Sequence, residues 1–184
     1  MVDRSPANQD SGQGAPALPP AHDIFLHVQG GDWQDRLPAI ETFVRETALA
    51  VLTQEWKQAR PLELSVVLAE DAFVRELNMT YRDQPKPTNV LSFPALGGDP
   101  VQETRGAEDA PVLLGDVVLA FETCAGEAQA LDAAAPFADH IRHLLVHGIL
   151  HLLGYEHEQD PEATRMETRE TQILAGFGVA NPYL

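Results

Sequence analysis

The sequence predicts an α+β fold in which helices pack against one small mixed sheet of four strands. Three observations carry this prediction. Four short apolar segments resemble strands, longer segments repeat apolar residues every three or four positions as helices do, and the two kinds are mixed along the chain. With 184 residues, of which 44% are hydrophobic, the chain is long enough for one domain with a substantial core and too short for two.

The N-terminal residues differ from the rest in composition. Residues 1–20 are rich in Pro, Gly, Ser and Gln and contain few large apolar side chains. Such a segment cannot bury enough apolar surface to offset the entropy lost on ordering. We therefore expect a disordered tail over residues 1–20, followed by a single domain over residues 21–184.

The first expected strand follows this tail. Ile24, Leu26 and Val28 alternate from position 23 onward and predict a strand with one buried face. His22 and His27 are then expected opposite the core. On this interpretation neither histidine is an attractive metal ligand.

Three more elements are expected before residue 83. Apolar residues at helical spacing predict a helix over residues 37–56, which Pro61 closes. Residues 62–68 alternate again and predict a second strand. Asp71 is the expected N-cap of the next helix, whose apolar stripe contains Val74, Leu77 and Tyr81.

The next two strands are separated by a long loop. Pro87 and Pro94 bracket residues 88–93, which favours an extended conformation at the edge of a sheet. Gly, Pro and acidic residues over 95–111 predict a loop near the site. Residues 112–120 are apolar enough for the fourth strand.

Three helices complete the predicted fold. They cover residues 121–131, 136–153 and 161–177. Asp160 is expected as the N-cap of the last helix, with Pro161 at its first position. Cys124 is the only cysteine and is interpreted as an ordinary helical residue, so the fold cannot rest on an internal disulfide.

The most informative motif is HGILHLLGYEH, whose histidines are His147, His151 and His157. Residues four apart lie on one helix face with Cβ atoms about 5–6 Å apart, so His147 and His151 can reach one metal ion at about 2.0–2.1 Å. Gly154 can end the helix with a positive φ at little steric cost, and the turn then brings His157 back over the first two. Three imidazoles that leave one coordination position open indicate a catalytic metal site.

The helix that carries this motif has a core-facing stripe beside the histidines. On a helical wheel this stripe spans about 100° and contains Phe137, Ile141, Leu144, Leu145, Gly148 and Leu152. His140 and His143 precede the pair by one or two turns of about 5.4 Å each, so they are expected outside the metal site. The candidate acceptors for the second N–H of a ligating imidazole are Glu156, Asp139 and Asp116.

The histidine spacing resembles the signature of the metzincin zinc peptidases. Those enzymes carry a Glu directly after the first His as general base, whereas Gly148 stands there in this chain. A peptidase is therefore an alternative that needs another base, for which Glu156 and Glu122 are the candidates.

Charge and hydropathy exclude some classes of protein. A formal charge of −16 argues against nonspecific wrapping of nucleic acid, which depends on Lys and Arg. No apolar run approaches the roughly 20 residues that span a bilayer, and the first residues lack the centre of a secretory signal, so we expect a cytoplasmic protein with no membrane partner. Most acidic residues are expected on solvated faces, such as the helix that contains Glu158, Asp160, Glu162, Glu167 and Glu170.

Four blocks resemble the YbeY family of bacterial metal-dependent endoribonucleases, which mature ribosomal RNA and take part in ribosome quality control: LNMTYRDQPKPTNVLSFP, LLGDVVLA, HGILHLLGYEH and RMETRE. The resemblance implies a zincin-like fold, with the metal site on a helix of the C-terminal half and the turn after it. It also implies that Arg82 is a functional residue and that the zinc ligands are His147, His151 and His157.

Two departures from the family pattern affect this resemblance. Glu156 replaces the usual Asp of the histidine block, which lengthens that side chain by one methylene. The family's Gly-x-Asp after the arginine is here Asp83-Gln84-Pro85, so the loop that follows Arg82 is expected to take a different path.

The resulting hypothesis is a zinc-dependent endoribonuclease specific for single-stranded RNA, acting in 16S rRNA 3′-end maturation and ribosome quality control. Arg82 and His147 are the expected catalytic residues, the first as a fork of donors for the phosphate. Ribosomal RNA and the small ribosomal subunit are the expected partners, and DNA is not. Nickel, copper and iron also suit imidazole ligands. Two alternatives are a ribosome assembly factor with a structural metal, and a surface role for Arg82 paired with Asp83.

Overall fold

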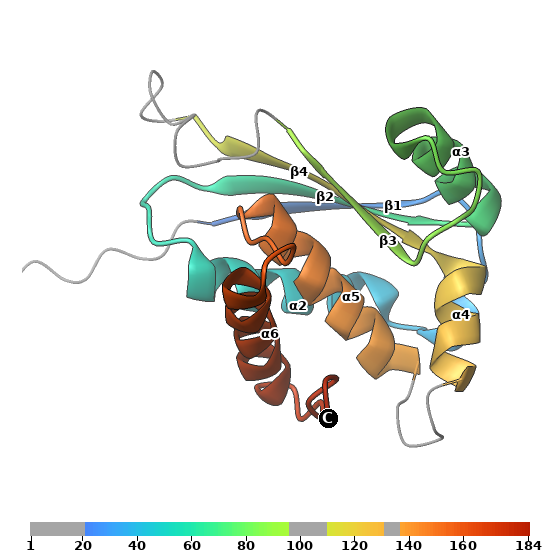
Figure 1. Ribbon diagram of the computed structural model, residues 1–184. Coiled ribbons are helices and arrows are strands. Elements are labelled where there is room, and N and C mark those ends of the chain that lie inside the picture. Colours follow the sequence, from blue (N-terminus) through green and yellow to red (C-terminus); the bar gives the residue numbers. More distant parts are fainter. Residues whose placement is uncertain (1–20, 96–109, 131–136) are drawn as a thin grey trace, which may run out of the picture.

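A computed structural model describes residues 21–95, 110–130 and 137–184 (Figure 1). The strands are β1 (Asp23–Val28), β2 (Leu62–Ala69), β3 (Val90–Pro94) and β4 (Val112–Ala120). The helices in these ranges are α1 (Trp33–Arg36), α2 (Ile40–Glu55), α3 (Asp71–Arg82), α4 (Phe121–Ala130), α5 (Phe137–Leu152) and α6 (Asp160–Ala175). The predicted α+β fold with a mixed four-stranded sheet is confirmed. The tail expected over 1–20 and most of the loop expected over 95–111 lie outside the described residues.

The sheet has the strand order β1-β2-β4-β3. β1 pairs in parallel with β2, and β2 in parallel with β4. β3 runs antiparallel to β4 and lies at the edge, where its flanking prolines are tolerated because an edge strand needs fewer ladder hydrogen bonds. The edge position predicted for this segment is confirmed.

The helices form layers on both faces of the sheet (Figure 1). α2 and α5 cover one face, and α6 packs against the outer side of α5. The main core fills the space between the sheet and these helices, and its fully buried side chains include Leu64 of β2, Val51 of α2 and Leu145 of α5. A smaller cluster under α3 on the opposite face includes Val74, Leu91 and Val118.

Three local predictions are wrong. His22 is 8% exposed rather than opposite the core, and its Nδ1 accepts the Leu62 N–H at 3.1 Å. Asp71 is the first residue of α3 rather than its cap. Likewise Asp160 is the first residue of α6, and Gln159 occupies the N-cap position.

The Asp71 carboxylate instead caps a different helix. It accepts hydrogen bonds from the backbone N–H and the hydroxyl of Thr123, at 2.9 and 2.7 Å, in the first turn of α4. In return, Glu122 of α4 accepts the Asp71 N–H at 2.7 Å. Each of these acidic side chains thus accepts a backbone N–H from the first turn of the other helix. One N–H group at each helix N-terminus, which has no acceptor within its own helix, is hydrogen-bonded in this way.

Helix α1 was not predicted, because four residues are too few to show a helical period. Its Trp33 is fully buried and packs edge-on against Phe121, with ring centroids 5.2 Å apart. None of the helices in the described ranges combines the length and the apolar character needed to cross a bilayer.

Candidate metal centre

Helix α5 places two histidines on one edge of the core. Its apolar stripe is buried as predicted, and Val146, Ile149 and Leu150 are buried as well. The helix is so extensively buried because it packs on the sheet beside α2, while α6 covers its outer side (Figure 1). His147 and His151 stay partly accessible, one turn apart, with ring centroids 4.6 Å apart.

A glycine turn returns the third histidine to the pair. Gly154 has a φ of 87°, in the left-handed region that glycine adopts readily. Hydrogen bonds from Gly154 N–H to the His151 carbonyl at 3.0 Å and from Tyr155 N–H to the Leu150 carbonyl at 3.0 Å close the helix. The ring of His157 then lies 5.5 Å from that of His147 and 4.9 Å from that of His151, measured between centroids.

The ring nitrogens of the three histidines converge. One nitrogen from each of His147, His151 and His157 lies within 4.8 Å of the others, a grouping that could hold a metal ion. The Nε2 atoms of His147 and His151 are 3.1 Å apart. Two nitrogens bound to one Zn²⁺ at a tetrahedral angle lie about 3.3 Å apart, so the donor set fits such an ion.

The Nδ1 atoms of His147 and His151 contact groups that can only accept a hydrogen bond. His147 Nδ1 donates to Glu170 Oε1 at 2.8 Å, and His151 Nδ1 donates to the Tyr155 carbonyl at 2.9 Å. Each Nε2 therefore presents a lone pair toward the other, and two facing lone pairs repel unless a cation lies between them. This tautomer is the one that binds a metal through Nε2.

The pKa values in this cluster favour the ligating forms. Burial and, to a smaller extent, the neighbouring His147 and His157 together lower the pKa of His151 to about 4. Burial alone raises the pKa of Glu170, but hydrogen bonds from His143, His147 and Tyr183 outweigh burial and lower it to about 2. Near neutral pH the cluster thus contains a neutral imidazole and an ionised carboxylate, the states that metal binding requires.

Glu170 corrects two expectations. The acceptors expected for the imidazole N–H groups were Glu156, Asp139 and Asp116, whereas the structure uses Glu170 and a backbone carbonyl. Glu170 was expected on a solvated face, yet it is 0% exposed. A signal was present in the sequence: Glu170 shares the apolar stripe of α6 with Met166, Ile173 and Leu174.

The two earlier histidines of α5 lie outside the three-histidine cluster, as expected. His140 Nε2 lies 2.8 Å from Glu127 Oε2, and His143 Nε2 lies 3.0 Å from Glu170 Oε2. Cys124 is fully buried, and burial raises the pKa of its thiol. This agrees with an ordinary core residue, since a reactive cysteine needs an exposed thiolate.

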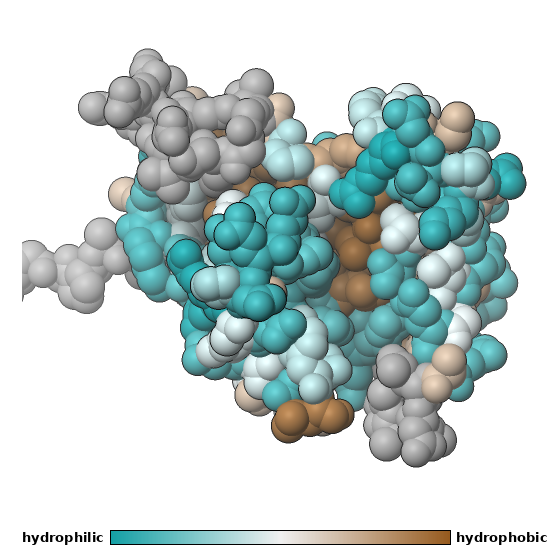
Figure 2. Space-filling model, viewed as in Figure 1, coloured by the Kyte–Doolittle hydropathy of each residue, from teal (hydrophilic) through white to brown (hydrophobic). Residues whose placement is uncertain are grey.

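Arg82 and the histidines share one pocket of about 500 Å³. The hollow between α5 and the segment that follows α3 is visible in Figure 2. Its walls come from the end of α3, strand β3, helix α5 and the turn after it, with the lining residues Arg82, Thr88, Asn89, Val90, Ser92, Pro94, His147, His151, Glu156, His157 and Glu158. In the described residues Arg82 forms no ion pair with Asp83, which disfavours that surface role.

The loop after Arg82 is anchored from within α3. Asp83 takes the left-handed conformation with a φ of 55°, at the position of the Gly in the pattern that the sequence resembles. Asn78 is 4% exposed, and its side-chain Nδ2 donates to the Lys86 carbonyl at 2.7 Å. Its backbone carbonyl accepts the Gln84 N–H at 3.3 Å. One buried asparagine therefore holds both sides of the loop beside the pocket.

Gly148 lies where the helix touches the sheet. A Cβ added there would lie 2.8 Å from Val117 Cγ1 and 3.2 Å from Ser92 Oγ. Ser92 also donates its hydroxyl to the Gly148 carbonyl at 3.0 Å. The position that carries the general base in metzincins thus has no room for a glutamate in this fold.

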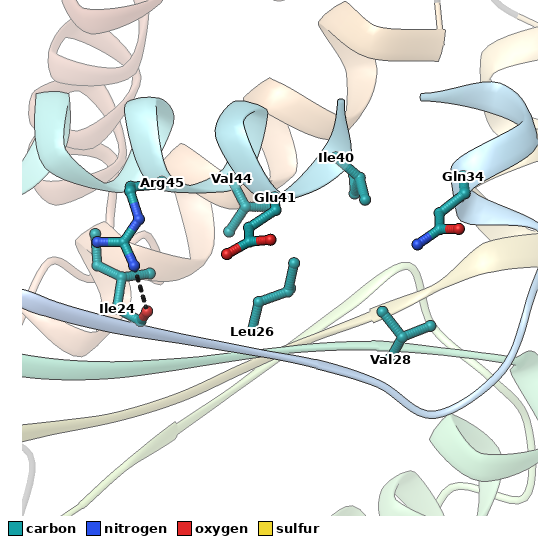
Figure 3. A pocket seen from close by; sticks show the side chains of 8 residues that line it. All are labelled: Ile24, Leu26, Val28, Gln34, Ile40, Glu41, Val44 and Arg45. Carbon is teal, nitrogen blue, oxygen red and sulfur yellow. Dashed lines mark hydrogen bonds between the residues drawn. The ribbon is translucent and has the colours of Figure 1, made fainter. Parts of the chain in front are cut away.

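A second hollow lies on the other side of the molecule from β3, between β1 and α2 (Figure 3). It measures about 260 Å³, and Arg45 donates to the Ile24 carbonyl at 3.4 Å at one end of it. Its lining residues are mainly aliphatic, with Gln34, Glu41 and Arg45 as the polar members. Among the described residues, no group of side chains that could hold a metal ion lies in this hollow.

Three imidazoles are directed toward one point in a polar pocket of an α+β domain. This arrangement is typical of a mononuclear metal-dependent hydrolase. Comparison with known proteins gives the family. The family model described as Endoribonuclease YbeY matches residues 29–178, and the chain belongs to that family.

Two curated relatives agree with this assignment, and one solved structure shows a similar fold. Endoribonuclease YbeY of Sinorhizobium fredii is 46% identical over 168 residues, which cover 89% of this chain and 92% of the relative. Endoribonuclease YbeY of Rhodospirillum rubrum is 45% identical over 174 residues, covering 90% and 84%. A solution structure of a Thermotoga maritima protein covers 86% of this chain and 93% of its own, with a TM-score of 0.51 and 23% identity, and shows a similar fold.

Proposed function

We propose that this protein is a zinc-dependent endoribonuclease that hydrolyses phosphodiester bonds in single-stranded RNA, acting in 16S rRNA 3′-end maturation and ribosome quality control. Family membership supports the reaction, since the curated relatives are named endoribonucleases. The observation that carries the proposal is the shared pocket of Arg82 and the three histidines.

His147, His151 and His157 would hold the metal, because their nitrogens converge and the donor set suits Zn²⁺. Nickel, copper and iron also suit imidazole ligands, so elemental analysis of protein purified without a histidine tag identifies the ion. When bound, the ion supplies a Lewis acid that polarises a phosphoryl oxygen and makes water a stronger nucleophile near neutral pH.

Arg82 supplies the positive charge for the phosphate. Arg82 is exposed and lines the same pocket as the histidines. A guanidinium is always charged and presents a planar fork of donors that matches two phosphate oxygens. Aimed at the oxygens that gain charge during cleavage, such donors stabilise the transition state more than the ground state.

A charge-reversal variant tests this role. Arg82→Glu is expected to lower the rate of RNA cleavage by at least about 100-fold while zinc content stays equal to that of the unaltered protein. Arg75→Glu is the matched control, because Arg75 is an exposed arginine on the same helix that does not line the histidine pocket. Loss of both zinc and cleavage in Arg82→Glu would show a structural role instead.

The peptidase alternative is disfavoured by the fold. Gly148 leaves no room for the metzincin base, and Glu122 accepts the Asp71 N–H at the start of α3 instead of lining the pocket. Glu156 is the candidate base that does line it. Incubation with labelled single-stranded RNA and with casein, each with and without chelator, separates the two enzymes: chelator-sensitive cleavage of RNA alone supports the proposal.

The domain and its partners are proposed on the same basis. Residues 21–184 form one metal-dependent endoribonuclease domain of zincin-like type, with the small ribosomal subunit as partner, no DNA substrate and a cytoplasmic location. A non-catalytic assembly factor would behave differently: its metal-free form would melt at a lower temperature and still bind the small subunit, and no preparation would cut RNA.

A further inference from the structure

We propose that Glu170, supported by His143 and Tyr183, is a positioning residue for His147, so that the last residues of the chain help to set the affinity of the centre for its metal. This inference rests on the metal-centre part of the proposed function. It concerns side chains outside the three histidines that would bind the ion.

Every oxygen of the buried Glu170 carboxylate has a partner. Oε1 accepts from His147 Nδ1 at 2.8 Å, whereas Oε2 accepts from His143 Nε2 at 3.0 Å and from the Tyr183 hydroxyl. The Glu170 side chain is 0% exposed, so these three groups, and not bulk water, are its hydrogen-bond partners in the folded protein. Because Oε2 is already used twice, the carboxylate has little freedom to rotate and Oε1 stays directed at His147.

The contact with Oε1 decides how His147 presents its ring. A carboxylate that accepts from Nδ1 keeps the proton on that nitrogen and leaves the Nε2 lone pair for a metal. That Nε2 faces His151 Nε2 at 3.1 Å. The same contact fixes the rotation of the ring about the Cβ–Cγ bond, so the ion does not have to order the ligand on binding.

Tyr183 is itself held in place near the C-terminus. Its backbone N–H donates to Asn181 Oδ1 at 2.9 Å, and Asn181 Oδ1 also accepts the Thr171 hydroxyl at 3.3 Å. Thr171 directly follows Glu170 in α6. The Tyr183 ring packs edge-on against His143, with centroids 5.7 Å apart. The C-terminal segment is therefore docked on α6 and α5 beside the carboxylate that it contacts.

The test measures zinc affinity by competition with a chromophoric chelator, using the full-length protein. Glu170→Gln keeps the shape of the side chain, and an orienting partner of this kind is worth about 10- to 100-fold in metal affinity, which is the weakening expected. Tyr183→Phe removes one hydroxyl only and is expected to weaken zinc binding several-fold. Tyr81→Phe is the control, because Tyr81 is an exposed tyrosine that is not among the hydrogen-bond partners of Glu170 in the described residues, and its zinc affinity should equal that of the unaltered protein.

A second readout separates positioning from general stability. Nitrogen NMR of the metal-free protein reports which ring nitrogen of His147 carries the proton, and Glu170→Gln is expected to move it from a single Nδ1–H form to a mixture. Zinc affinities of Glu170→Gln and Tyr183→Phe within twofold of the unaltered protein would overturn the inference. An effect of Glu170→Gln without one of Tyr183→Phe would overturn the part assigned to the C-terminal segment. If the unaltered protein bound no zinc, the proposed metal centre would fail first.

Discussion

A substitution at Gly148 tests how closely α5 packs against the sheet. In Gly148→Ala the added Cβ would lie 2.8 Å from Val117 Cγ1, closer than real Cβ atoms approach. Val117 is fully buried on the central strand β4 and is β-branched, so its side chain cannot easily turn away. The helix must therefore shift from the sheet or distort.

Two opposing terms determine the size of the effect. Replacing Gly by Ala inside a helix favours folding by about 1 kcal/mol, whereas overpacking a close-packed core costs about 1–3 kcal/mol. Gly126→Ala isolates the first term, because Gly126 lies in α4 with nothing within 4 Å of an added Cβ. We expect Gly126→Ala to stabilise the protein by about 1 kcal/mol and Gly148→Ala to be about 1–3 kcal/mol less stable than Gly126→Ala.

Urea unfolding and thermal melting measure the difference, which for a domain of this size corresponds to at least about 2 °C in Tm. A double-mutant cycle identifies the contact. Val117→Ala should cost less in the Gly148→Ala background than alone, because it removes the methyl group that the new Cβ meets. Equal stabilisation by Gly148→Ala and Gly126→Ala would refute the reasoning, and with it the steric argument against a base at this position.

Four other outcomes follow from the structure. In the metal-free protein the pKa of His151 is about 4 against an ordinary 6.5, so the unfolded chain binds that proton first and the free energy of unfolding should fall as pH decreases from 6.5 to 4. The pKa of Glu170, about 2 against 4.5, extends this loss below pH 4.5, and a Tm that is flat across both ranges would contradict it. Zinc at 100 times its dissociation constant should stabilise the protein by about 2.7 kcal/mol, reversibly with a chelator, and His151→Ala should abolish the shift. Asn78→Ala should cost about 1–3 kcal/mol and slow RNA cleavage through misplacement of Arg82, whereas a cleavage rate equal to wild type would show that the loop needs no anchor. The Cys124 thiol should react with a disulfide reagent only after unfolding, and rapid reaction in the native protein would contradict its burial.

The secondary structure was predictable where a segment is long enough to repeat. Two-residue alternation located β1 and β2, the flanking prolines located β3, and an apolar run located β4. Five of the helices in the described ranges were also predicted within a few residues. They missed α1, which is too short to repeat. The N-cap expectation for Asp71 failed because its carboxylate caps Thr123 in a helix far along the chain, a partner that local sequence does not contain.

The candidate site was predictable to the extent that it is local. His147, His151 and His157 are joined by one helical turn and one glycine turn, so backbone geometry alone brings their rings together. The orienting carboxylate was missed because Glu170 lies on a different helix, in a segment whose other acids face solvent. Only the packing of α6 on α5 distinguishes it from them.

By itself the sequence determined that three imidazoles converge at the C-terminal end of helix α5, because helical period and a left-handed glycine act between neighbouring residues. Tertiary structure alone decided that Glu170 and Tyr183 support His147, that Arg82 shares its pocket, and that Gly148 has no space for a base. The physical reason is that these three contacts depend on how the helices pack against the sheet. Close packing of the core determines this arrangement through contacts between segments that are distant in the chain.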